Sequence, residues 1–244
     1  TATSVIDSTK ASRMSALSRW LCVMRWLNGI VVLRLASLVK GQNKKPLKLN
    51  CLAASAPRYE SLRTDYDRVL RQRSALLKSA GRRSVGAAQT LDVWDEQFAI
   101  HGAALVHERL TALDRVAPWI TQHGELISGG TEPLRAEYST KWLDPGTRDV
   151  SAITNQLRVA IRQRRDEEVD RGVCLVGPHR DDVALTLSGG PAKGYASHGQ
   201  SWSIALALRL AVFSVLRELD DDPVLILDDV FAELDARRRE RLLD

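Results

Sequence analysis

The C-terminal part of this chain restricts its possible folds more than any other stretch. Ser197-His198-Gly199-Gln200 precedes a long apolar-periodic segment, which predicts a helix over residues 201–218. The apolar run Val224–Leu227 then predicts a buried parallel strand, and Asp228 and Asp229 follow directly. Ligands of open α/β sheets bind at the carboxyl ends of the strands, so the two carboxylates lie where a ligand would bind.

The residues before this helix have the composition of a phosphate-binding helix start. Serine at position 197 favours the N-cap, and glycine at position 199 allows another group to approach the backbone closely. The N–H groups and the dipole at a helix N-terminus attract anions. Taken alone, this pattern is more often an ordinary helix cap. Its position one helix before an acidic strand end favours a nucleotide site.

These segments resemble the RecF family of bacterial recombination-mediator ATPases, whose core is an ATP-binding cassette. Four blocks in the family's order carry the resemblance: Gly177 to Asp182, Ala192 to Gln200, Ala205 to Leu210 and Leu227 to Asp235. A further block from Ala56 to Ser79 resembles the start of that family's helical arm. The similarity therefore covers about residues 50 to 244.

The resemblance implies an α/β fold, namely an incomplete ABC-type (P-loop NTPase-like) ATPase lobe with an inserted α-helical arm domain. We expect three parts: a diverged or uncertain N-terminal segment (1–49), the helical arm domain (50–171) and the lobe part with signature, Walker B strand and D-loop (172–244). In the arm, apolar spacing predicts one helix from Pro57 to Ser79 and a second, antiparallel one from Thr90 to about Ala117.

The segment that follows the arm's second helix is rich in glycine and proline. Residues 123–149 are predicted as an irregular connection with a short strand around 134–138. A third helix begins near Ile153 and ends at Gly172. Residues 173–176 and 183–187 are predicted as strands, the second of them followed by a turn.

The phosphate-binding loop of the cassette is missing from the sequence. No Gly-x-x-x-x-Gly-Lys-Ser/Thr occurs in the 244 residues, and that loop cradles the phosphates with N–H groups and a lysine. Gly172 and Gly177 have its spacing, but Pro178 and His179 stand where lysine and Ser/Thr are needed. The chain also begins at Thr1 without an initiator methionine. We therefore expect a fragment that is inactive alone, taken from a weak ATPase.

The resemblance assigns a role to several residues around ATP and Mg²⁺. Asp228 would hold the Mg²⁺, and Asp229 would be the catalytic residue that orients the attacking water. In an ATP-dependent homodimer, nucleotide held by the other subunit would be contacted by the signature and D-loop residues Ser197, Gly199, Gln200 and Asp235. The complete protein would bind single-stranded or gapped DNA. It would act with RecR and RecO to place the RecA recombinase during repair, replication and the SOS response.

Positive charge is concentrated in the expected arm. The formal net charge is +5, and the stretch 58–83 alone holds eight basic and three acidic residues, which equals that excess. Such a helix face can neutralise DNA phosphates without reading sequence. The candidate DNA-binding residues are Arg58, Arg63, Arg68, Arg71 and Arg73. The alternative is a solvated helix face with local ion pairs.

Cysteine usage and hydropathy indicate the cellular compartment of the protein. The three cysteines are odd in number, far apart and without CxxC spacing, so neither a disulfide framework nor a zinc site is indicated. The apolar stretch 20–39 is interrupted by Arg25 and Arg34, which disfavours a membrane span. We therefore expect a cytoplasmic protein. The first 49 residues could be diverged domain sequence or the product of an altered reading frame.

His179 and Arg180 belong to a family block of uncertain role. We predict that Arg180 forms a structural ion pair with Asp181 or Asp182, although contact with DNA or nucleotide stays open. Two alternatives to the whole interpretation also remain. The chain could derive from another ABC/SMC-type ATPase, or it could be a non-catalytic remnant or interaction fragment, which the missing loop would favour.

Overall fold

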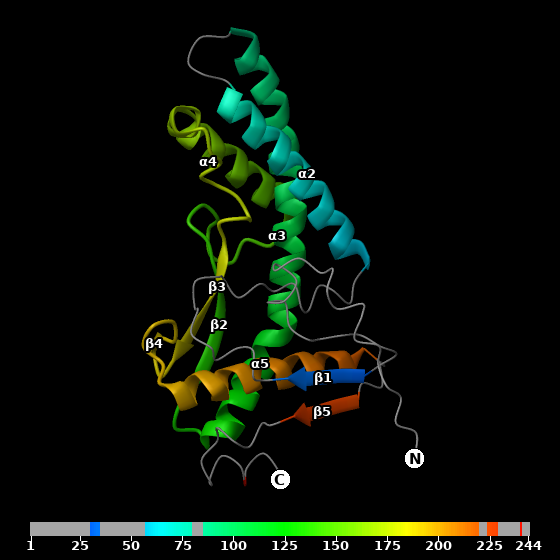
Figure 1. Ribbon diagram of the computed structural model, residues 1–244, viewed down its shortest axis with the longest axis vertical. Helices are drawn as coiled ribbons and strands as arrows, with labels where there is room; N and C mark the ends of the chain where they lie inside the picture. The colour runs from blue at the N-terminus through cyan, green and yellow to red at the C-terminus, as the bar shows by residue number, and fades with distance from the viewer. Residues whose placement is uncertain (1–29, 35–56, 80–84, 220–223, 229–239, 241–244) are drawn as a thin grey trace, which may run out of the picture.

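Two long helices form the upper part of the molecule. The computed structural model describes residues 30–34, 57–79, 85–219, 224–228 and 240. Helix α2 (Pro57–Ser79) packs along the N-terminal part of α3 (Val85–Ser128) and runs antiparallel to it (Figure 1). Helix α4 (Val150–Arg171) packs against both. The predicted first helix and the antiparallel arrangement are confirmed.

Helix α3 connects the two ends of the molecule. It has 44 residues and continues through Pro118, so the prediction of an irregular chain over residues 123–128 is wrong. The helix continues because Val116, Ile120 and Ile127 are buried in one apolar core. It ends where Gly130, at φ 77°, donates its N–H to the carbonyl of Glu125 at 2.9 Å, a helix stop that requires a left-handed backbone.

An antiparallel sheet lies beside the lower part of α3. Strand β3 (Asp182–Leu187) pairs with β2 (Leu134–Ser139) on one side and with the short β4 (Gly190–Pro191) on the other. Between β3 and β4, Ser188 and Gly189 have φ values of 52° and 81°, as a two-residue hairpin turn requires. The predicted strands over 134–138 and 183–187 are confirmed. The strand predicted over 173–176 is absent, since none of these residues is assigned to a strand.

Helix α5 (His198–Glu218) crosses the lower end of α3 (Figure 1). A pair of parallel strands contacts the apolar core shared by these two helices, through Leu225. Strand β5 (Val224–Asp228) pairs with β1 (Ile30–Arg34), so that Ile30 stands opposite Val224 and Arg34 opposite Asp228. The predicted parallel strand is therefore present. Its partner β1 comes from the N-terminal segment for which no structure was predicted.

The two largest apolar cores of the described residues share α3. The larger, here called the lobe core, joins the C-terminal part of α3 with β2, β3 and α5. The second, here called the arm core, joins α2, the middle of α3, α4 and Val176. By length and composition α5 could cross a membrane, but 67% of its most apolar window is buried inside the protein. It is a core helix of the lobe.

Candidate functional site

The start of α5 is a closed capping box. Ser197 is the N-cap, its Oγ accepts the Gln200 N–H at 3.2 Å, and the Gln200 Oε1 accepts the Ser197 N–H at 2.8 Å. The reciprocal bonds satisfy two backbone donors of the helix start. The predicted cap is confirmed, and the helix begins at His198, three residues earlier than expected.

This helix start is accessible from solvent. Ser197 and His198 are exposed, and Gly199 and Gln200 are half-buried. The Ser197 Oγ uses a lone pair in the capping box, which leaves its hydroxyl proton for another acceptor. The positive end of a 21-residue helix dipole points the same way. The arrangement fits an anion such as a phosphate oxygen.

Glu132 contacts Gln200, one of the predicted signature residues, and was missed by the sequence analysis. The Gln200 Nε2 donates to the Glu132 Oε1 at 2.7 Å, and 68 positions separate the two residues. Glu132 lies in the link between α3 and β2. No local pattern distinguishes it from other surface carboxylates, so only the tertiary structure brings the two side chains together.

The predicted acidic site is described only in part. Asp228 is the last residue of β5 and stands opposite Arg34 in the pairing with β1. Its side chain, together with Asp229 and Asp235, lies outside the described residues. Among the residues that are described, no group of three or more His, Cys, Asp or Glu could hold a metal ion. The Mg²⁺ and catalytic assignments therefore stay predictions.

Four of the five candidate DNA-binding arginines lie on the outside of α2. Arg58 and Arg68 have side chains 80% and 64% exposed, and each contacts one carboxylate, Glu108 at 3.4 Å or Asp65 at 3.0 Å. Arg71 is also exposed. Two more cations belong to this surface of α2. Arg63 is half-buried between Glu60 and Asp67, and Lys78 is exposed. Arg68, Arg71 and Lys78 share one face, because helical neighbours recur at three, four and seven residues.

Arg73 is the exception, and its assignment to DNA is wrong. Its side chain is 0% exposed, with Nε 2.6 Å from Asp95 Oδ1 and Nη2 2.5 Å from Glu168 Oε2. It lies on the face of α2 that packs against α3 and α4. Burial alone would lower the pKa of Arg73, but the hydrogen bond with Glu168 and the charge of Asp95 hold that pKa above its ordinary value. The guanidinium is a structural cation.

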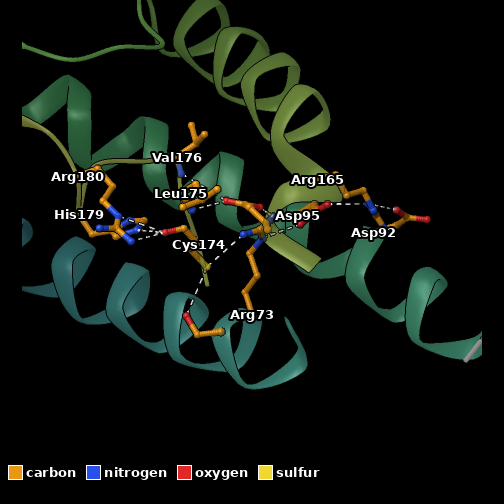
Figure 2. A network of polar contacts seen from close by, with 11 residues as sticks. Arg73, Asp92, Asp95, Arg165, Cys174, Leu175, Val176, His179 and Arg180 are labelled. Atoms are coloured by element: carbon orange, nitrogen blue, oxygen red, sulfur yellow. Dashed lines mark hydrogen bonds and ion pairs between the residues drawn. The ribbon is translucent and has the colours of Figure 1, made fainter. Parts of the chain in front are cut away.

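Arg73 and Glu168 hold the segment that leads from α4 to β3. Figure 2 shows Arg73 near Cys174, Leu175 and Val176 of this segment. The Arg73 Nη1 donates to the Cys174 Sγ at 3.1 Å, and Glu168 Oε1 accepts the N–H groups of Leu175 at 2.5 Å and Val176 at 3.4 Å. We call this set the arm junction: Arg73, Asp95, Glu168, Cys174, Leu175 and Val176. These backbone N–H groups bind a carboxylate in place of a neighbouring strand, which explains why the predicted strand is absent.

Arg180 also binds the segment between α4 and β3, at the carbonyl of Cys174. Its Nη2 and Nε donate to the Cys174 carbonyl at 2.9 and 3.2 Å (Figure 2). The predicted ion pair with Asp181 or Asp182 is not formed, because Asp181 accepts from Tyr138 and Trp142, and Asp182 faces Lys193 at 3.7 Å. Arg180 therefore organises the turn before β3.

Asp181, which is buried, and His179, which is half-buried, are titratable groups near this turn. The Tyr66 O–H lies 2.7 Å from His179 Nδ1, and His179 Nε2 lies 3.3 Å from the Cys174 carbonyl. This geometry suits a neutral ring with its proton on Nε2. Burial lowers the pKa of His179 to about 4. Burial also raises the pKa of Asp181 to about 6, against the hydrogen bonds that Tyr138, Thr140 and Trp142 donate to it.

The two shifts should affect stability in opposite directions below pH 6.5. The unfolded state protonates His179 before the folded state does, so acidification towards pH 4 destabilises the fold. For Asp181 the folded state takes up the proton first, so acidification from about pH 6 towards pH 4 stabilises it. At pH 4.5 the effect amounts to about 2 kcal/mol for Asp181 and about 2 to 3 kcal/mol for His179, given about 1.4 kcal/mol for each pKa unit. They should largely cancel.

We therefore expect Asp181→Asn and His179→Gln to change the pH profile of stability oppositely. Relative to the unmodified chain, D181N should lose about 2 kcal/mol of unfolding free energy between pH 7 and pH 4.5, and H179Q should gain a similar amount. Urea unfolding followed by tryptophan fluorescence at both pH values measures this. Parallel profiles for all three proteins would contradict the two pKa directions.

Comparison with curated proteins gives relatives that carry the same name. The chain is 45% identical over 229 residues to the "DNA replication and repair protein RecF" of Rhodococcus erythropolis, a match that covers 84% of this chain and 56% of the relative. Identity to the protein of the same name from Kineococcus radiotolerans is 48% over 228 residues, with 84% and 58% covered. The chain thus spans somewhat over half the length of these relatives. No protein-family model matches it.

Solved structures show the same backbone arrangement. The structure of the recombination mediator protein RecF with ATP, in the RecFOR pathway, superposes with a TM-score of 0.76 at 26% identity, and the match covers 88% of this chain and 58% of that one. A second RecF structure, with ATPrS, gives a TM-score of 0.72 at 25% identity. The predicted fold class, an incomplete α/β ATPase lobe with a helical arm, is confirmed.

Proposed function

Because this chain belongs to the RecF family, we propose that it forms the arm and the signature-bearing part of an ATP-dependent DNA-binding protein of recombinational repair, replication and the SOS response. The observation that carries the proposal is its 45–48% identity to RecF proteins over 84–85% of its length. Since it spans 56–58% of those relatives, the activity of the whole protein is part of the proposal.

The division into an arm (50–171) and a lobe part (172–244), after an uncertain segment (1–49), belongs to the proposal as well. The arm core supports it, because α2, α4 and the middle of α3 pack around common residues. The C-terminal part of α3, from Leu113 to Ile127, packs in the lobe core with α5. In space, this part of α3 would belong to the lobe although it precedes residue 172.

On the nucleotide side, Ser197, Gly199 and Gln200 would contact ATP held by a second copy, so that ATP would stabilise a homodimer. The surface position of the α5 start and the Ser197 hydroxyl support this, since a helix N-terminus binds phosphate oxygens. Asp228 would hold Mg²⁺, Asp229 would orient water, and Asp235 would contact the other subunit. The metal, when bound, would neutralise phosphate charge.

On the DNA side, exposed and half-buried arginines of α2 would contact phosphates of single-stranded or gapped DNA. They are Arg58, Arg63, Arg68 and Arg71, now without Arg73. Phosphate contacts of this kind position a protein on DNA and carry no sequence information. By family membership the complete protein would act with RecR and RecO to place RecA, and it would do so in the cytoplasm.

An Arg68→Ala, Arg71→Ala double variant should bind DNA more weakly at every sequence and with a shallower salt dependence. Each lost phosphate contact should reduce the slope of log affinity against log salt by about 0.7 to 0.9, so the pair should reduce it by roughly 1.5. Fluorescence anisotropy with labelled single-stranded and gapped DNA, between 50 and 200 mM salt, measures both quantities.

The matched control removes two exposed arginines of α4, Arg164 and Arg171, which both pair with Glu167. This variant loses the same net charge from another helix and should keep the slope of the unmodified chain. Equal salt slopes for both variants would show that DNA binding depends on the net charge of the chain and not on a defined surface of α2. Absence of DNA binding by the unmodified chain would contradict the proposed function for the arm.

A further inference from the structure

Glu132 has a fixed position between α3 and the sheet. Its N–H lies 3.4 Å from the Ser128 Oγ, and the Thr131 Oγ1 donates to the Ser128 carbonyl at 2.8 Å. Gly129 and Gly130, with φ values of 68° and 77°, turn the chain sharply out of the helix. The end of α3 therefore determines where the Glu132 carboxylate lies.

That carboxylate restrains the one side chain that closes the capping box. The Gln200 carboxamide has both ends bound, with Oε1 accepting the Ser197 N–H at 2.8 Å and Nε2 donating to Glu132 at 2.7 Å. Leu134, Leu187 and Ile204 line the hollow beside this contact. A hydrogen bond to an ionised acceptor is stronger than a neutral one, so Glu132 selects one orientation of the carboxamide.

We propose that Glu132 is a positioning residue for the nucleotide contact of α5. By holding Gln200 it keeps the capping box closed, so that the Ser197 hydroxyl and the N–H groups of the first turn are in place before a phosphate arrives. The proposal rests on the proposed function, in which this helix start binds nucleotide held by another subunit. Glu132 itself touches neither nucleotide nor metal.

The hydrogen bond between Gln200 and Glu132 also links the start of α5 to the end of α3, the helix shared by the lobe core and the arm core. A polar contact also joins α3 itself to α5, between His123 Nε2 and Ser214 Oγ at 2.8 Å. The two helices also pack together in the lobe core. Removal of the Glu132 carboxylate should therefore leave α5 docked on α3 and loosen only its first turn.

The test is ATP-dependent association of the fluorescently labelled chain with the RecF protein of Rhodococcus erythropolis, which would supply the ATP-bound subunit. The readout is the ATP concentration that gives half-maximal association, measured by anisotropy. Glu132→Ala should raise it about fivefold, the equivalent of about one hydrogen bond. Glu132→Gln should stay within about twofold, because its carboxamide oxygen can still accept from Gln200.

Two further variants identify the route of the effect. Glu137→Ala removes an exposed carboxylate of β2 with no contact to Gln200 among the described bonds and should leave the ATP requirement unchanged. In a Gln200→Ala background, E132A should not raise the ATP requirement any further, because the effects of residues that act through one another are non-additive. An additive effect would overturn the positioning role.

Ser197→Ala separates this proposal from the function on which it rests. If S197A raises the ATP requirement while E132A stays within about twofold of the unmodified chain, Glu132 has no positioning role and the nucleotide site stands. If neither S197A nor ATP itself changes association, the proposed nucleotide contact is wrong. If urea unfolding without ATP shows that E132A also lowers the stability of the fold, the decision rests on two other results: the ATP requirement of E132Q, and that of E132A in the Gln200→Ala background.

Discussion

Replacing Glu168 by alanine should lower the free energy of unfolding by about 3 to 5 kcal/mol, the range observed when one partner of a buried ion pair is removed. The variant leaves the fully buried Arg73 guanidinium with Asp95 as its carboxylate partner in the arm junction. It also removes the acceptor of the Leu175 and Val176 N–H groups. Urea unfolding followed by circular dichroism at pH 7 measures the change.

The neighbouring residue provides the control. Glu167 pairs with Arg164 and Arg171, whose side chains are 60% and 62% exposed, so Glu167→Ala should change the same free energy by less than about 1 kcal/mol. A loss of that small size in the Glu168 variant would mean that the arm junction does not stabilise the fold. A large loss in both variants would point to helix α4 itself.

Replacing Gly177 by alanine should be nearly as damaging, with a loss of about 2 to 5 kcal/mol from backbone strain and overpacking together. Gly177 has φ 121°, and a Cβ there would lie 2.7 Å from Phe98 Cζ and 3.0 Å from the Tyr66 hydroxyl oxygen. Both rings are buried in the arm core, so neither can move away freely. Thermal and urea unfolding of the variant measure the loss.

Gly189 distinguishes the two causes. It also has a positive φ, 81°, but a Cβ added there meets nothing within 4 Å, so Gly189→Ala reports strain alone. Phe98→Leu should partly restore Gly177→Ala, because a smaller side chain frees space beside residue 177. If G177A and G189A lose equal stability, and F98L gives no restoration, close packing at Gly177 contributes nothing.

Local signals explain the elements that could be predicted. The apolar stripe of α2 and the serine cap of α5 depend on residues within a few positions of each other, and both predictions are confirmed. Glycine and proline were less informative for α3, which continues through Pro118 as far as Ser128. There, burial of distant positions in the lobe core outweighs the local preference for a break.

The candidate site could be predicted only where its parts are close in sequence. Ser197 and Gln200 lie three positions apart, and their mutual hydrogen bonds follow from the N-cap pattern. Glu132 and Glu168 act over separations of 68 and 95 residues, on Gln200 and Arg73 respectively. Contacts of that range leave no periodic or spacing signal along the chain.

By itself the sequence determined the helical arm, the strands over 134–138 and 183–187, the capped start of α5 and the family, because these depend on local spacing and on ordered blocks of residues. Only the tertiary structure decided what each charged residue does. Arg71 and Arg73 stand two positions apart on α2, yet Arg71 is exposed and Arg73 is fully buried. Successive helical residues point in directions about 100° apart, and the packing of α3 and α4 determines which direction faces water.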